Sequence, residues 1–176
     1  LIENGFFCRS SLLAWYWKSS GFRFVATFLP ERQPLFLSLA VLLPVFRFLT
    51  SLVYRARFPG FFLNRQDEAH RIVQAIGAPN LKVQMDLFHC QIVEGDLSAK
   101  VAQYLPTGRV GHFQIADVPA RNEPGTGEVN WDHIFKTIDE VSAACGWDGW
   151  IGCEYNPADA TTGGTSHGLS WARGYL

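Results

Sequence analysis

Methionine, paired cysteines and long apolar runs are scarce or missing in this sequence of 176 residues. The only methionine is Met85, so we expect a fragment, a processed product or the product of an unusual gene model. The four cysteines lie far apart and form no CxxC pair, which argues against a zinc site and a small disulfide framework. Free thiols in a reducing compartment are the simplest interpretation, and we expect a cytoplasmic protein.

The sequence also lacks the features of membrane and nucleic-acid-binding proteins. Its formal net charge of −1 gives no basic field for nucleic acid or for an anionic membrane. The apolar stretch from Leu35 to Phe46 is interrupted by Pro44 and followed by Arg47, short of the roughly 20 residues that a membrane helix needs. No short basic start precedes this stretch, so a signal peptide is not indicated either. A membrane location is therefore not expected, and a weak anchor is the alternative.

Charge divides the chain into two parts. Residues 1–57 carry a net charge of +5, whereas residues 58–176 carry −6. The first part is aromatic and aliphatic without a stable period, and two such different segments rarely share one core. We expect residues 1–57 to be an apolar segment outside the enzyme fold and residues 58–176 to be the folded domain.

Helical and strand patterns alternate after Pro59. In the first helix, Asn64 is the expected N-cap and Ile76 belongs to the expected apolar face. The sequence predicts helices near 64–76, 96–105 and 131–145, strands at 81–86, 110–117 and 150–155, and a short C-terminal helix from Leu169. Strands separated by amphipathic helices pair in parallel through right-handed crossovers, so the fold class is α/β.

Each predicted strand carries one oxygen-bearing side chain near its C-terminal end: Asp86, Gln114 and Glu154. In barrels of parallel strands the functional groups gather at that end. Three oxygen donors converging there suit a hard divalent cation such as Mg²⁺ or Mn²⁺. The alternative is a satisfied polar network without metal. His89 follows the first strand, where either a ligand or substrate contact or a capping role would suit it.

Four sequence blocks, 84–89, 111–117, 121–128 and 149–155, resemble hydroxypyruvate isomerases, which belong to the xylose isomerase-like barrels. The resemblance runs from about Pro59 to Leu176 and corresponds to the last three strands of a (β/α)8 TIM barrel. It implies a divalent metal, Mg²⁺ or Mn²⁺, held by Asp86, Gln114 and Glu154. It also implies that Glu154 is one member of the acid–base pair.

The implied reaction interconverts hydroxypyruvate and 2-hydroxy-3-oxopropanoate, a step of glyoxylate and carbohydrate metabolism. A proton leaves C3 and returns at C2 through an enediolate, and a carboxylate can move it. Arg121 is the candidate partner for the substrate carboxylate, although a turn-surface arginine is the simpler interpretation. A sugar epimerase of the same superfamily is a weaker alternative, because such epimerases tend to carry histidine where this chain has Gln114.

The sequence also departs from this family. Members carry a glutamate-bearing strand before the Pro59-Gly60 pair, and counting back without gaps reaches Ser51. The glutamate of the fifth strand and recognisable first to fourth strands are missing. We therefore expect this chain by itself to be truncated and weakly active or inactive. The competing hypothesis is a non-catalytic remnant that needs a partner chain, and an oligomer is left open.

Overall fold

In the computed structural model, the described residues are 62–159 and 169–175, together with the backbone of four short strands at 7–8, 15–18, 21–24 and 48–51. The apolar stretch from Leu35 to Phe46, and the proposed anchor with it, lies outside these residues. Within the described residues, no helix is long and apolar enough to cross a membrane.

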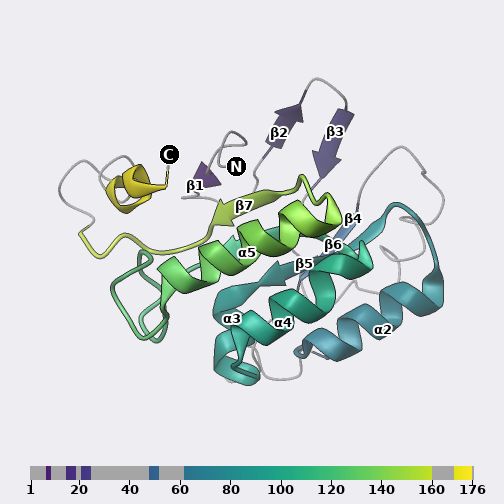
Figure 1. The fold of residues 1–176 in the computed structure, drawn as a ribbon, viewed down its shortest axis with the longest axis horizontal. Coiled ribbons are helices and arrows are strands. Elements are labelled where there is room, and N and C mark those ends of the chain that lie inside the picture. The colour runs from purple at the N-terminus through teal and green to yellow at the C-terminus, as the bar shows by residue number, and fades with distance from the viewer. Residues whose placement is uncertain are drawn as a thin grey trace.

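A parallel sheet forms the centre of the fold (Figure 1). Its three inner strands are β5 (Leu81–Asp86), β6 (Val110–Ile115) and β7 (Trp150–Cys153). All three begin where the sequence predicts, and β6 and β7 end two residues earlier than expected. Their parallel pairing confirms the α/β prediction.

Short strands from the first part of the chain extend this sheet. β4 (Phe48–Ser51) pairs in parallel with β5, and β1 (Phe7–Cys8) pairs in parallel with β7. Strands β2 (Trp15–Lys18) and β3 (Gly21–Phe24) form a separate antiparallel pair. Ser51, the residue reached by counting back to the expected glutamate, is the last residue of β4 and lies opposite Gln84 of β5.

Helices link successive strands of the sheet from β4 to β7, and in Figure 1 α2, α4 and α5 lie in front of the sheet. They are α2 (Gln66–Ile76), α4 (Leu97–Tyr104), continued by the 3-10 turn η2 (Leu105–Thr107), and α5 (Trp131–Cys145). Gly77 and Gly146 end α2 and α5 in the left-handed conformation that favours glycine. A short 3-10 helix, η3 (Ser170–Gly174), follows near the C-terminus.

One helix is absent from the sequence prediction. Helix α3 (Leu87–Val93) begins directly after β5, without a loop between them. Asp86 ends the strand and caps the helix, because its side chain accepts a hydrogen bond from the backbone N–H of His89. No turn residues separate the strand pattern of β5 from the helical pattern of α3, so the sequence does not indicate where the strand gives way to the helix.

Helix α2 also differs from its prediction in its cap and its buried face. Its N-cap is Arg65 rather than Asn64, and Ile76 is 39% exposed. His70, for which a surface or helix position is the simplest expectation, lies in α2 but is buried and stacked on the ring of Tyr104 at 4.0 Å. The helix therefore presents a histidine to the core beside Ala69 and Val73.

Candidate active site

The three predicted site residues lie at one end of three adjacent parallel strands. Asp86 of β5 is opposite Gln114 of β6, and Gln114 is opposite Gly152 of β7. Glu154 follows two residues after Gly152, and its N–H donates to the carbonyl oxygen of Ile115 at 3.0 Å. Because side chains alternate along a strand, Glu154 belongs to the same face as Gly152 and Gln114.

Asp86 is a buried carboxyl group next to a buried histidine. Its Oδ1 accepts from the N–H of His89 at 3.1 Å, and its Oδ2 lies 3.6 Å from His89 Nε2. Burial raises the pKa of Asp86 to about 6, against the lowering effects of Arg121, the two backbone donors at His89 and Phe88, and Glu154. His89 thus both completes the cap of α3 and places its ring at the site.

Glu154 is the second carboxyl group, and it lies within hydrogen-bonding reach of Asp86. Burial and then the charge of Asp86 raise the pKa of Glu154, while Arg121 and His89 lower it. Two neighbouring carboxyl groups with raised pKa values can share and exchange a proton. This is the property that general acid–base chemistry needs.

A pair of glutamines, one on β5 and one on β6, lies beside these carboxyl groups. The Gln84 side-chain amide donates to Oε1 of Gln114 at 2.5 Å, which fixes the orientation of Gln114. Next to them, Gly152 gives room to the ring of His112, since a Cβ on this glycine would lie 2.8 Å from His112 Nε2. Gln84, His112 and Gly152 are therefore parts of the site for which the sequence argument proposed no functional role.

Arg121 supplies the positive charge of the site. One of its terminal guanidinium nitrogens lies 3.0 Å from Glu154 Oε2, and its Nε donates to the backbone carbonyl of Glu154 at 3.1 Å. Its guanidinium carbon lies 4.9 Å from the centre of the Phe88 ring. Arg121, the candidate partner for the substrate carboxylate, therefore lies at the candidate site. The sequence of its loop alone is only weak evidence for a functional role.

The donor set at the strand ends partly suits a divalent cation. Asp86 and Glu154 are adjacent carboxyl groups with raised pKa values, and a cation would offset the cost of their joint ionisation. The amide oxygen of Gln114 is a third hard donor, engaged here by Gln84. Nevertheless, no group of three or more His, Cys, Asp or Glu side chains within the described ranges could hold a metal ion. The described residues therefore offer at most part of a coordination shell.

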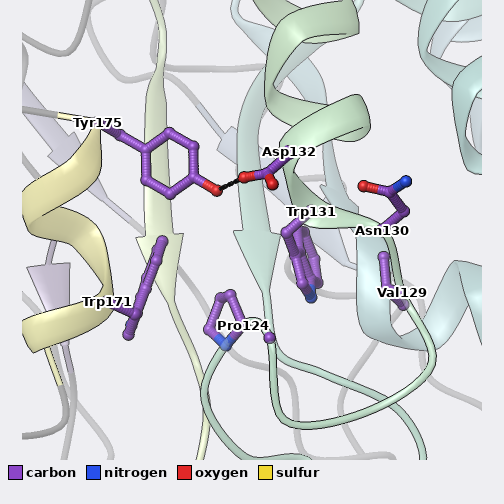
Figure 2. Close-up of a pocket in the computed structure, with 8 residues that line it drawn as sticks. Pro124, Val129, Asn130, Trp131, Asp132, Trp171 and Tyr175 are labelled. Atoms are coloured by element: carbon purple, nitrogen blue, oxygen red, sulfur yellow. Dashed lines mark hydrogen bonds between the residues drawn. The ribbon is translucent and has the colours of Figure 1, made fainter.

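A separate pocket of about 210 Å³ lies beside the start of α5 (Figure 2). Trp131, Trp171 and Tyr175 give it an aromatic lining to which Pro124 adds an aliphatic ring, and the Tyr175 hydroxyl donates a hydrogen bond to Asp132. None of the predicted site residues lines this pocket. We place the site at the strand ends because the titratable groups converge there.

Comparison with known proteins identifies the fold family. The family model described as "Xylose isomerase-like TIM barrel" matches residues 56–175. The chain belongs to this family. In a barrel of this family, β5, β6 and β7 are the last three strands, so the sequence prediction of a partial TIM barrel is confirmed.

Curated relatives in this family are named as isomerases. The chain is 50% identical over 118 residues to a 2-oxo-tetronate isomerase of Cupriavidus necator, covering 67% of this chain and 42% of the relative. It is 41% identical over 117 residues to the hydroxypyruvate isomerase of Escherichia coli K12, covering 66% and 42%. The chain thus spans about two-fifths of the length of these relatives.

A solved structure gives the same result for the fold. The protein described as "AP endonuclease, family 2" from Brucella melitensis is 38% identical, with a TM-score of 0.63. The match covers 74% of this chain and 46% of that one. The xylose isomerase-like architecture of the C-terminal two-thirds therefore rests on both sequence and structure.

Proposed function

We propose that residues 58–176 form the C-terminal part of an isomerase that interconverts hydroxypyruvate and 2-hydroxy-3-oxopropanoate. The observation that carries this proposal is the pair formed by the buried Asp86 and the partly buried Glu154 carboxyl groups, with Arg121 beside them. It combines a proton-exchanging group with a cation for a substrate carboxylate. The names of curated relatives at 41–50% identity support the same reaction class.

The chemistry requires a proton to leave C3 of hydroxypyruvate and to return at C2. Glu154 is the proposed acid–base residue at this end of the site, and burial beside Asp86 raises its pKa toward the range that suits proton transfer. Arg121 binds the substrate carboxylate through its guanidinium fork. His89, held against Asp86, is the proposed second substrate contact.

A divalent metal, Mg²⁺ or Mn²⁺, is the proposed cofactor. Asp86, Gln114 and Glu154 would hold it, with further ligands from outside the described residues. When bound, such a metal would stabilise the negative charge that develops on the two substrate oxygens.

A second candidate substrate is 2-oxo-tetronate. The Cupriavidus relative at 50% identity carries that name, and 2-oxo-tetronate shares the 2-oxo-carboxylate group that Arg121 would recognise. Comparing initial rates on the two compounds would separate these candidates. A preference for 2-oxo-tetronate would keep the isomerase class and change the substrate.

We further propose that the protein acts in the cytoplasm and that residues 1–57 do not contribute a catalytic group. The acid–base pair of the family requires a glutamate on the strand before β5, and β4 ends there in Ser51. The function is tested by a chimera that places the missing barrel strands of a homologue before residue 58. Conversion of hydroxypyruvate by this chimera supports the isomerase, whereas inactivity of a folded chimera on both substrates contradicts it.

A further inference from the structure

A buried carboxylate organises the loop that carries Arg121. Asp117 lies two residues after the end of β6, is 1% exposed, and accepts hydrogen bonds from four backbone N–H groups. Its Oδ1 accepts from Val118 at 2.8 Å and from Val129 at 3.2 Å. Its Oδ2 accepts from Gly125 at 2.8 Å and from Gly127 at 2.9 Å. One side chain thus holds both ends of the loop from Val118 to Val129.

The loop closes so tightly around this carboxylate that one position admits only glycine. A Cβ at Gly127 would lie 2.1 Å from the carbonyl oxygen of Val118 and 2.6 Å from Oδ1 of Asp117. The neighbouring Glu128 N–H donates to that same Val118 carbonyl at 2.9 Å. Backbone and side chain therefore enforce one loop conformation.

This conformation determines where Arg121 lies. The N–H of Arg121 donates to the backbone carbonyl of Asp117, and the N–H of Asp117 donates to Asn122, both at 2.9 Å. Arg121 has a positive φ of 61°, a strained backbone state for a residue with a side chain. Such strain persists only when the surrounding structure imposes it. In this state the guanidinium group reaches Glu154 and Phe88.

We propose that Asp117 is a positioning residue that holds Arg121 in place as the anion-binding group of the site. Asp117 acts through the loop and does not touch the carboxyl pair. The cationic fork is preformed, so binding a carboxylate does not require the loop to be ordered first. The inference rests on the proposed function only for the identity of the anion, a 2-oxo-carboxylate.

The test compares Asp117→Asn with the full wild-type chain by NMR. An asparagine replaces one carboxylate oxygen by an NH₂ group, which would then face two N–H donors, so two of the four hydrogen bonds are lost. The signal of the Arg121 Nε–H, which donates to Glu154, and the exchange rates of the Gly125, Gly127 and Val129 amides are followed. Hydroxypyruvate is titrated as the probe.

We expect Asp117→Asn to lose the protected Arg121 signal and to exchange the loop amides at least tenfold faster. Its Kd for hydroxypyruvate should rise at least tenfold, while the exposed control Asp148→Asn behaves like the wild type. A variant with faster loop exchange but an unchanged Arg121 signal and unchanged Kd would overturn the inference, because Asp117 would then be only structural. So would a variant with all three readouts unchanged.

A second variant tests the same inference with the Asp117 side chain unchanged, in case Asp117→Asn does not fold. Gly127→Ala retains Asp117 but pushes the loop away from it, so it should reproduce the loss of the Arg121 signal. Gly174→Ala, where an added Cβ meets nothing within 4 Å, is the control. If Gly127→Ala leaves Arg121 unchanged, the inference fails. If wild type binds no hydroxypyruvate yet Asp117→Asn releases Arg121, the positioning role stands, and the proposed function is decided by the chimera.

Discussion

At the scale of single residues, the candidate site combines three strand-end side chains with Arg121, which reaches Glu154 from a loop. Asp86, Gln114 and Glu154 could be placed on one face because strand alternation and parallel pairing fix the position of each strand's last residues. The ion pair between Arg121 and Glu154 spans 33 positions and depends on the loop conformation, which no periodicity encodes. Likewise, the sequence pattern predicts Asp117 only as the last residue of a strand and gives no sign of its hydrogen bonds to the loop.

His70 offers a pH-dependent prediction at this scale. Burial, followed by the charge of Arg109, lowers the pKa of His70 to about 4, and neither ring nitrogen has a hydrogen-bond partner among the described residues. The native state therefore keeps the ring neutral, while the unfolded chain takes up a proton below about pH 6.5. This contribution to stability is complete above pH 6.5 and is lost as the pH falls toward 4.

The expected loss is up to about 3 kcal/mol in the free energy of unfolding. Urea titrations between pH 7.5 and 4.5 measure it. His70→Phe keeps an aromatic ring against Tyr104 but cannot titrate, so its stability should fall less steeply with acid. The exposed control His133→Phe should retain the wild-type slope. Identical slopes for His70→Phe and wild type would contradict the assignment.

At the scale of elements, the start of helix α2 depends on a distant carboxylate. The first N–H of the helix, at Gln66, donates to Oε1 of Glu94 at 2.6 Å. The Glu94 side chain is 2% exposed and its Oε2 also pairs with Lys100 Nζ at 2.7 Å. This replaces the local cap that was expected at Asn64, because a residue 28 positions away fills the same role.

Glu94→Ala should therefore destabilise the chain by about 2–3 kcal/mol, since it leaves a helix N–H and a lysine without their acceptor. Denaturant unfolding measures the change. Glu140→Ala is the matched control, because Glu140 is exposed and its nearest Lys136 nitrogen is 3.9 Å away. The control should change stability by less than about 0.5 kcal/mol. Equal effects of the two substitutions would show that Glu94 does not cap α2.

Helices and strands were predicted correctly where apolar residues repeat with a clear helical or strand period. α5 and β5 have the predicted bounds because a long apolar stripe and clear ends define them. Helix α3 was missed because it begins without a turn after β5. The sequence predicts Asp86 only as a metal ligand, and the structure shows that Asp86 also caps α3.

At the scale of the whole molecule, the chain provides the final three strands of a barrel together with the strand ends at which we place the candidate site. A barrel of this family needs about 250 residues, and the chain spans about two-fifths of its curated relatives. The division near residue 57 remains a proposal, and β4 and β1 add only short edges to the sheet.

We predict that the purified 176-residue chain turns over hydroxypyruvate at or near background. The described residues place Glu154 at the candidate site. However, β4, the strand before β5, ends in Ser51, where the family resemblance predicts a glutamate. A coupled assay for 2-hydroxy-3-oxopropanoate measures this. Robust activity that Asp86→Ala abolishes would show instead that the chain is a complete catalyst.

The central claim is that Glu154 transfers the proton of the isomerisation, and the kcat of Glu154→Gln in the chimera tests it most directly. Glutamine keeps the shape and one oxygen but cannot accept a proton at neutral pH. We predict that kcat falls by about 10²-fold or more, with a smaller change in KM, while Glu140→Gln matches the parent chimera. Recovery of the rate with added Mg²⁺ or Mn²⁺ would reduce Glu154 to a metal ligand, and an unaltered kcat would contradict the mechanism.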